Sequence, residues 1–252
     1  MSQKNLNKKL DLLFGSLKIK KGDNIIIHSN IAGILQFYGK NKEDACELFI
    51  SYLKKSIGKT GTLIIPAYNY KFTKGESFDV KSSISEVGFF SNYLLKKNWN
   101  KRTFDPVFSH LIFGKIDNFS FESINTEAFG KNSLFSNFQK EKIKIFCFCC
   151  SPDRITFFHF IEYIFKVPYR FVKKFSGNLI HKGLKKKIIY EYNVGKKSID
   201  YSIKEKKITQ LLNNKEFKRE IFGKFECYLF KGDALIKKFK KIFKKNKYYL
   251  VQ

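Results

Sequence analysis

Three apolar runs that do not alternate with polar residues constrain the fold of this chain most. They span residues 25–27, 63–65 and 143–150, and stretches with helical spacing separate them. A strand that is apolar on both faces is covered on both faces, as parallel strands usually are. The sequence therefore predicts an α/β fold, a three-layer α/β/α sandwich around a mixed, mostly parallel sheet, with a β-rich C-terminal part.

The same spacing and the turn signals place the other elements. We expect helices at residues 10–17, 44–57, 87–97 and 153–165, a further strand at residues 108–113 and a β-rich meander at residues 175–203. No linker rich in Pro, Gly or Ser divides the chain, and no internal repeat occurs. We therefore expect one domain over residues 1–252, with a motif-bearing part at 15–175 and a β-rich and helical part at 176–252.

Hydropathy and cysteine content indicate the compartment. No apolar run is long enough to cross a bilayer, and no secretory signal precedes the first helix. The five cysteines are an odd number, and Cys147, Cys149 and Cys150 share one expected strand. Reduced, buried thiols fit this pattern, so we expect a cytoplasmic protein. Strand spacing of the cysteines does not favour a metal site, and we expect no metal.

The net charge of +27 is carried almost wholly by lysine, because only four of the 49 basic residues are arginine. Arginine favours bidentate phosphate contacts and no nucleic-acid motif is present, so we expect no specific nucleic-acid partner. A lysine-rich surface attracts anions and repels polycations over about 10 Å. Residues 233–249 form a basic amphipathic helix. This helix either docks its apolar stripe on the domain or makes a weak contact with an anionic membrane surface.

The strongest local pattern for chemistry is Thr156, His159 and Glu162 on one expected helix. At about 100° per residue the three side chains fall within an arc of about 120°, so imidazole and carboxylate can be neighbours. A carboxylate fixes the tautomer of a histidine and stabilises its cation, which makes the histidine a better general base. The alternative is a hydrogen-bonded histidine packed in an aromatic core. No Gly-x-Ser-x-Gly elbow, phosphate-binding loop or Gly-x-Gly-x-x-Gly motif occurs, which argues against several other enzyme classes.

Six short motifs within about residues 15–175 resemble, in their order, the aminoglycoside 3-N-acetyltransferase family. In chain order they are Gly22-Asp23 with the strand end His28-Ser29-Asn30, Gly61-Thr62-Leu63-Ile64-Ile65-Pro66, Arg102-Thr103-Phe104-Asp105-Pro106-Val107-Phe108-Ser109, Phe129-Gly130-Lys131-Asn132-Ser133, the helix of Thr156, His159 and Glu162, and Pro168-Tyr169-Arg170. Each motif is weak alone, and the series is specific.

The resemblance implies a single acetyltransferase domain that transfers acetyl directly from acetyl-CoA to an amine of an amino sugar. It implies that His159 takes the proton of the amine, Glu162 orients the imidazole, and Thr156 adds a hydrogen bond. The residues expected to hold acetyl-CoA are His28, Ser29, Asn30, Arg102 and Ser109. The residues expected to contact the substrate are Tyr68, Asn69 and Asp105. Because a thioester is already activated, no covalent enzyme intermediate is needed.

Two residues depart from the pattern of the family. Asp105 stands where the family has histidine, and Asn30 stands where it has serine. Asp105 can contact the substrate amine or can cap the turn before Pro106, and the sequence leaves both roles open.

The surplus of positive charge bears on the acceptor. Aminoglycosides are polycations, so a strongly basic protein is a poor host for them unless an acidic patch lies at the site. We therefore predict an amino sugar, nucleotide-linked and used in surface-glycan biosynthesis, with aminoglycoside 3-N-acetylation in antibiotic resistance as the alternative. A further alternative is a non-enzymatic basic protein that binds RNA or a membrane surface. The sequence leaves open whether the protein is a monomer or a homodimer.

Overall fold

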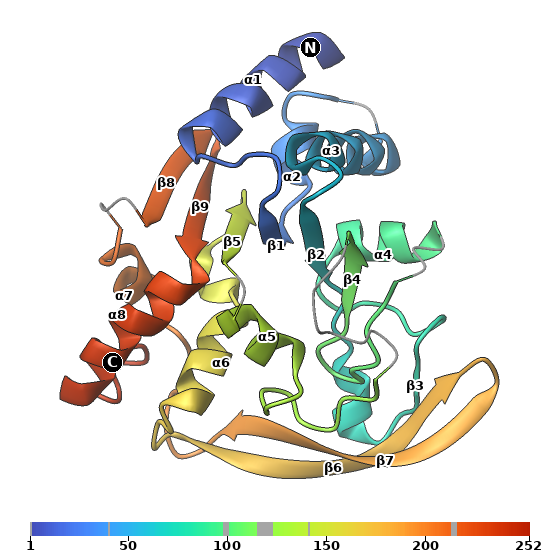
Figure 1. The fold of residues 1–252 in the computed structure, drawn as a ribbon, viewed down its shortest axis with the longest axis vertical. Coiled ribbons are helices and arrows are strands. Elements are labelled where there is room, and N and C mark those ends of the chain that lie inside the picture. The colour runs from blue at the N-terminus through green and yellow to red at the C-terminus, as the bar shows by residue number, and fades with distance from the viewer. Residues whose placement is uncertain (1, 40, 98–100, 115–122, 141, 213–215) are drawn as a thin grey trace.

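A six-stranded sheet organises the chain (Figure 1). The structure is a computed structural model that describes residues 2–39, 41–97, 101–114, 123–140, 142–212 and 216–252. The strands lie in the order β4 (His110–Phe113), β2 (Thr62–Pro66), β1 (Asn24–Ser29), β5 (Ile143–Phe148), β9 (Phe225–Lys231) and β8 (Phe217–Phe222). β1 is parallel to β2 and β5, whereas the outer pairs are antiparallel. The predicted α/β fold with a mixed sheet is confirmed, with its parallel pairs at the centre.

The central strands bury residues on both of their faces. In β1, Ile25 and Ile27 belong to one hydrophobic cluster and Ile26 belongs to the other. β2 does the same with Leu63 and Ile64, which lie on opposite sides of the sheet. A strand covered on both faces has no solvated side that calls for polar residues, which explains why these apolar runs are continuous.

Two layers of helices cover the sheet. The cluster on one face receives residues from α1 (Gln3–Ser16), α2 (Ala32–Leu35), α3 (Lys42–Ile57) and α4 (Phe89–Lys96). The cluster on the other face receives residues from α5 (Leu134–Lys140), α6 (Phe157–Ile164), α7 (Glu205–Thr209) and α8 (Gly232–Lys245). The chain thus builds one layer with its first part and the other with its second, and the predicted three-layer sandwich is confirmed.

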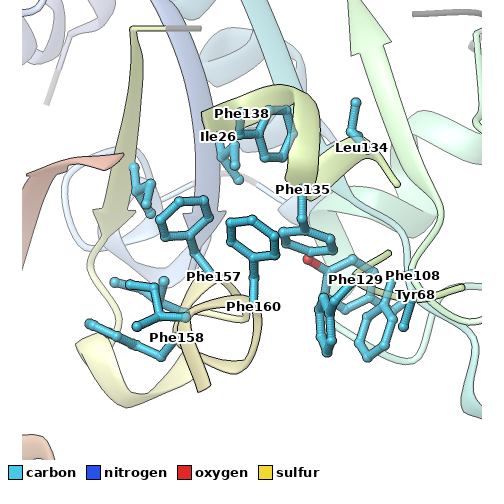
Figure 2. Close-up of a cluster of buried hydrophobic side chains, with 14 of the residues drawn as sticks. Ile26, Tyr68, Phe108, Phe129, Leu134, Phe135, Phe138, Phe157, Phe158 and Phe160 are labelled. Atoms are coloured by element: carbon cyan, nitrogen blue, oxygen red, sulfur yellow. The ribbon is translucent and has the colours of Figure 1, made fainter. Parts of the chain in front are cut away.

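Aromatic rings fill the space between the sheet, α5 and α6 (Figure 2). The rings of Phe135 and Phe160 stack with centroids 6.2 Å apart, and Phe135 meets Phe129 edge to face at 5.2 Å. Such pairs add to the free energy gained by burying their area, about 1 kcal/mol each. The packing therefore fixes the position of α6, the helix that carries His159.

The expected meander at residues 175–203 is instead one long hairpin that begins earlier. Its strands are β6 (Arg170–His181) and β7 (Leu184–Gly195), and a short strand, β3 (Phe78–Asp79), pairs with β6. The turn is made by Lys182 and Gly183, which both have positive φ. The hairpin extends along one end of the molecule in Figure 1.

The helix expected at residues 153–165 begins later than its apolar pattern indicates. Residues Pro152–Arg154 form a short 3₁₀ turn, η2, and α6 starts only at Phe157. Proline at the first position favours such a turn, because it supplies no backbone donor and restricts the residue before it. His159 and Glu162 remain on one regular helix.

The C-terminal basic helix docks on the domain. In α8, Leu235, Phe239 and Phe243 are buried in the same cluster as α6, whereas most of its lysines are exposed. Contact with an anionic membrane surface stays a prediction. Among the residues that the structure describes, no helix combines the length and the apolar character that a membrane span requires.

Candidate active site

A cavity of about 370 Å³ opens where β1 and β2 end. Carboxyl ends of parallel strands are where open α/β sheets usually place ligands. Four of the predicted site residues line it, His28, Ser29, Tyr68 and Thr156, together with Ile27, Ile65, Pro66, Tyr70, Glu86, Val87, Phe90, Ser91, Cys150 and Arg154. Burial lowers the pKa of His28 to about 4, so this imidazole is neutral near neutral pH.

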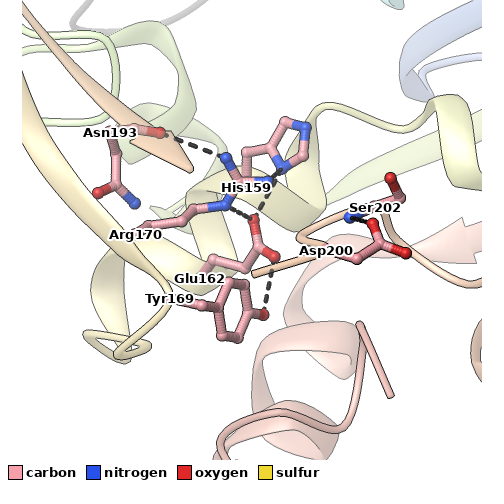
Figure 3. Close-up of polar contacts among 7 residues, drawn as sticks. All are labelled: His159, Glu162, Tyr169, Arg170, Asn193, Asp200 and Ser202. Atoms are coloured by element: carbon pink, nitrogen blue, oxygen red, sulfur yellow. Dashed lines mark hydrogen bonds and ion pairs between the residues drawn. The ribbon is translucent and has the colours of Figure 1, made fainter. Parts of the chain in front are cut away.

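His159 and Glu162 form the hydrogen-bonded pair that their spacing predicts (Figure 3). The imidazole Nδ1 lies 2.7 Å from Glu162 Oε2, and the side chain of His159 is 26% exposed whereas that of Glu162 is fully buried. A carboxylate is only an acceptor, so the ring proton is on Nδ1 and is donated to Glu162. Nε2 is then left with its lone pair, which is the state that a general base requires.

Glu162 is also held by two neighbours beyond the end of α6. Its Oε1 accepts a hydrogen bond from the Tyr169 hydroxyl at 2.8 Å, and its Oε2 lies 2.6 Å from Arg170 Nε. Burial by itself would raise the pKa of Glu162, but His159, Arg170 and Tyr169 outweigh burial and lower it. The carboxylate is therefore ionised whenever the site is folded near neutral pH.

Arg170 connects this pair to the hairpin. It is the first residue of β6, and its guanidinium donates to the carbonyl of Asn193 on β7 at 3.4 Å. The ring of Tyr201 packs on the guanidinium with its centroid 5.4 Å away, and Arg170 Nη2 lies 3.1 Å from His159 Nδ1. The sequence places Arg170 in a family motif but does not indicate its contact with the imidazole.

Thr156 lies at the start of α6, one turn before His159. Its backbone carbonyl accepts from the His159 amide at 2.9 Å, and its side chain makes no capping hydrogen bond. Thr156 lines the cavity together with Tyr68, whose hydroxyl is 3.2 Å from His110 Nε2. Thr156 therefore joins the helix of His159 to the wall of the cavity.

Arg102 and Ser109 make buried contacts with the backbone. The guanidinium of Arg102 donates to Ser109 Oγ at 3.0 Å and to the carbonyls of Ala67 at 2.9 Å and Ser83 at 2.5 Å. Ser109 Oγ donates to the Ala67 carbonyl at 2.7 Å. Both residues are almost fully buried. Their geometry holds the loop after β2 in place, and their contact with acetyl-CoA stays a prediction.

Asn30 and Asn69 accept hydrogen bonds from nearby backbone. Asn30 Oδ1 accepts from the Ala32 amide at 3.1 Å, at the start of α2. Asn69 Oδ1 accepts from the Lys71 amide at 3.1 Å, at the start of η1 (Tyr70–Lys74). Such side chains organise turns and caps. Neither lines the cavity, and their ligand contacts stay predictions.

Asp105 caps the turn that follows it. Its Oδ1 accepts hydrogen bonds from the backbone amides of Val107 at 3.0 Å and Phe108 at 2.6 Å and from the Tyr190 hydroxyl at 2.8 Å. Its Oδ2 accepts a hydrogen bond from the side-chain amide of Asn125 at 2.8 Å. Burial raises the pKa of Asp105 to about 6 against these four hydrogen bonds. The capping role is thus present, and a contact with the substrate amine stays a prediction.

A small acidic recess lies one turn along α6 from His159. It is lined by Glu127, Glu191, Tyr163 and Asn193, with Ala128, Phe129, Gly130 and Val172. The Glu127 carboxylate lies so close over Gly130 that a Cβ there would be 1.5 Å from its Oε2. Neither glutamate stands out in the sequence, although Gly130 belongs to the Phe-Gly motif that carries the resemblance.

No group of three or more potential metal ligands occurs in the described parts of the chain.

The sequence profile described as aminoglycoside 3-N-acetyltransferase matches residues 26–244. The chain belongs to this family. The resemblance inferred from the motifs is confirmed, and with it the enzyme class, a CoA-dependent N-acetyltransferase.

Several solved proteins share the fold, among them aminoglycoside acetyltransferases. AAC(3)-IIb matches with a TM-score of 0.76 and 16% identity over 95% of this chain and 97% of that chain. AAC-IIIb, solved as a binary complex with CoASH, gives 0.75 and 14% over 97% of both chains. The YokD protein from Bacillus subtilis gives 0.73 and 16% over 98% of this chain and 100% of that chain. No curated protein sequence matches the chain significantly.

The cavity fits the donor of this family, acetyl-CoA. Its volume lies in the range of small-molecule sites, and it combines apolar walls with the hydroxyls of Ser29 and Ser91, which suits a pantetheine arm. Arg154 lines the same cavity with a side chain that is 77% exposed. An exposed guanidinium can meet the phosphates of CoA in charge-assisted hydrogen bonds.

Proposed function

We propose that this enzyme transfers the acetyl group of acetyl-CoA to an amine of an aminoglycoside, with His159 as the general base. The observation that carries the proposal is the hydrogen bond between His159 Nδ1 and the buried carboxylate of Glu162. It leaves Nε2 free to accept the proton that the attacking amine must lose. Glu162 balances the positive charge that the imidazole gains, and Tyr169 and Arg170 keep that carboxylate in position.

Acetyl-CoA supplies an activated acyl group when it is bound. We assign its pantetheine arm to the cavity lined by Ser29, Ser91 and Thr156, and its phosphates to the side of Arg154. Thr156 and His159 are one helical turn apart on α6, so the cavity and the base share one rigid element.

The acidic recess supports a cationic acceptor. The net charge of +27 would repel a polycation on average, and this repulsion is the reason to expect a nucleotide-linked sugar. Charges more than about 10 Å apart are screened, so the field near the base depends on its own neighbours. The recess beside Tyr163 of α6 holds Glu127 and Glu191, of which Glu191 also pairs with the exposed Lys174, and these carboxylates can pair with ammonium groups of the acceptor.

The decisive experiment follows the release of the CoA thiol from acetyl-CoA with two panels of acceptors. One panel holds aminoglycosides, including sisomicin and apramycin, which solved relatives bind. The other holds nucleotide-linked amino sugars. The acetylated nitrogen of each product is then located by NMR. We expect turnover with the aminoglycosides, and loss of turnover of about 10²-fold or more in His159→Ala.

Two further variants accompany this assay, one as a control and one as a test of the acceptor site. His181→Ala removes another partly buried histidine, on the hairpin, and should keep wild-type turnover. Glu191→Gln should raise the KM for the aminoglycoside and leave the KM for acetyl-CoA unchanged. Turnover only with nucleotide-linked sugars would refute the assignment of the acceptor, and full activity of His159→Ala would refute the assignment of the base.

A further inference from the structure

A tyrosine hydroxyl and a buried imidazole form a polar pair beside the donor cavity. Tyr68 lines the cavity together with Thr156. Tyr68 Oη lies 3.2 Å from Nε2 of His110, a residue of β4 that is fully buried. Figure 2 shows the Tyr68 hydroxyl pointing toward the side of α6. The function proposed above gives no role to His110.

His110 is neutral in the folded protein. Burial, with a smaller repulsion from His28, lowers the pKa of His110 to about 3, and the Phe108 backbone offsets only part of this. A neutral imidazole carries one proton, on Nδ1 or on Nε2. Nδ1 is buried and makes no hydrogen bond among the described residues.

The proton of His110 therefore belongs on Nε2, where it has an acceptor in Tyr68 Oη. A buried N–H without a partner is rarer and more costly than an unpaired acceptor. With His110 donating to the Tyr68 oxygen, the proton of the Tyr68 hydroxyl itself is left to donate elsewhere. Tyr68 lines the cavity, so this proton can be donated to a ligand bound there.

We propose that the Tyr68 hydroxyl, oriented by His110, donates a hydrogen bond to the thioester carbonyl oxygen of the bound acyl donor. This inference rests on the proposed function, because it places the acetyl thioester in this cavity. Burial raises the pKa of Tyr68, so the hydroxyl keeps its proton and remains a donor. A fixed donor aimed at the oxygen on which negative charge develops stabilises the transition state.

The step balances without any further reactant. The C–N bond forms as the C–S bond breaks, the proton of the amine goes to His159 Nε2, and the sulfur leaves as the thiolate of CoA. Tyr68 keeps its proton throughout and supplies only a hydrogen bond. His110 touches neither substrate, and it is a positioning residue for Tyr68.

Infrared spectroscopy of bound [1-¹³C]acetyl-CoA tests the contact without any acceptor. A hydrogen bond to the thioester carbonyl lowers its stretching frequency relative to free acetyl-CoA. We expect this shift in the wild type and in Tyr52→Phe, which removes another buried tyrosine hydroxyl, the one that donates to Asp11. We expect the shift to vanish or shrink in Tyr68→Phe, while calorimetry shows unchanged affinity for CoA. Equal shifts in wild type and Tyr68→Phe would overturn the proposal.

The tautomer of His110 gives a second, independent test. ¹⁵N NMR of the imidazole should place its proton on Nε2, and a proton on Nδ1 would overturn the proposal, since Tyr68 would then donate to His110. In turnover, Tyr68→Phe should lower kcat about 10²-fold with little change in the KM for acetyl-CoA. His110→Gln, whose amide can replace the Nε2–H donor, should retain more of kcat than His110→Phe. A carbonyl shift in a wild type that acetylates no amine would refute the proposed function and leave this contact standing.

Discussion

The buried carboxylate of Glu162 accepts hydrogen bonds from His159 and Tyr169 and forms an ion pair with Arg170. Glu162→Gln keeps the shape of the side chain and removes its charge. It leaves the guanidinium of Arg170 buried without a counter-charge, which costs about 3 kcal/mol or more. It also removes the acceptor that holds the ring proton on Nδ1 of His159.

We expect Glu162→Gln to lower kcat about 10²-fold or more and to lower the free energy of unfolding. Acetyl transfer assays and urea denaturation measure the two effects. Asp200→Asn is the matched control, because Asp200 pairs with Lys204 and accepts from the Ser202 amide at an exposed position, where an ion pair contributes little. Equal kcat values for the two variants would contradict the role given to Glu162.

Asp105 makes the stability of the protein depend on pH. Its pKa is raised to about 6 by burial in the folded state, whereas an unfolded aspartate has a pKa of about 3.9. The folded state therefore holds this proton more tightly, so the contribution to stability is complete below about pH 4 and is lost as the pH rises through about 6. Asp105→Asn does not titrate and can keep the hydrogen bonds to Oδ1.

We expect the stability of Asp105→Asn relative to wild type to rise by about 2 kcal/mol between about pH 4 and pH 7. Urea unfolding of both proteins across this range measures the difference. A difference that does not change with pH would show that Asp105 keeps an ordinary pKa in the folded protein.

Residue spacing by itself predicts only the part of the site that lies on one element, whereas the family resemblance also indicated His28, Ser29 and Tyr68, which line the cavity. His159 and Glu162 are three residues apart on a helix, so helical geometry alone brings them together. Arg170 follows a turn whose direction no local pattern reveals, and Glu127 comes from a separate segment. Contacts that depend on how the chain turns between elements are invisible to spacing arguments.

At the scale of elements, α8 shows how far an apolar stripe decides packing. Phe239 is fully buried, and its ring lies 5.7 Å from that of Phe158 on α6. We expect Phe239→Ala to lower the free energy of unfolding by about 3–5 kcal/mol, because it leaves a cavity under the helix. Lys240→Ala, at an exposed position on the same helix, should change it by less than about 0.5 kcal/mol. Thermal unfolding of both variants checks the contrast, which vanishes if α8 is not docked in solution.

The inner strands with continuous apolar runs at residues 25–27, 63–65 and 143–150 were predicted from the sequence, whereas the edge strand β8 was not. β1, β2 and β5 lie inside the sheet, and each contains a continuous apolar run, at residues 25–27, 63–65 and 145–148. β8 is an edge strand with Lys218, Arg219 and Glu220 in its middle, a pattern that indicates a solvated loop as well as a strand. Its pairing with β9 is decided by the sheet already formed beside it, a long-range effect.

On the scale of the whole molecule, the net charge of +27 attracts the anionic acyl donor, acetyl-CoA. A basic surface raises the local concentration of a polyanion, and salt screens this attraction. We expect the affinity for CoA, measured by calorimetry, to fall as the ionic strength rises from low to physiological values. The affinity for the uncharged analogue acetyl-pantetheine should not change. Equal salt dependence for both ligands would show that the phosphates make no use of the basic surface.

The position of Arg170 suggests how this protein could be re-engineered. Arg170 is the first residue of the long hairpin and also pairs with Glu162, the carboxylate that holds the imidazole of His159. The start of the hairpin is therefore part of the active site. The far end, at Lys182 and Gly183, is a tight turn distant in sequence from Arg170. The hairpin should therefore be shortened, or fused to another protein, at the turn of Lys182 and Gly183. A change at its first residue would remove the contact between Arg170 and Glu162.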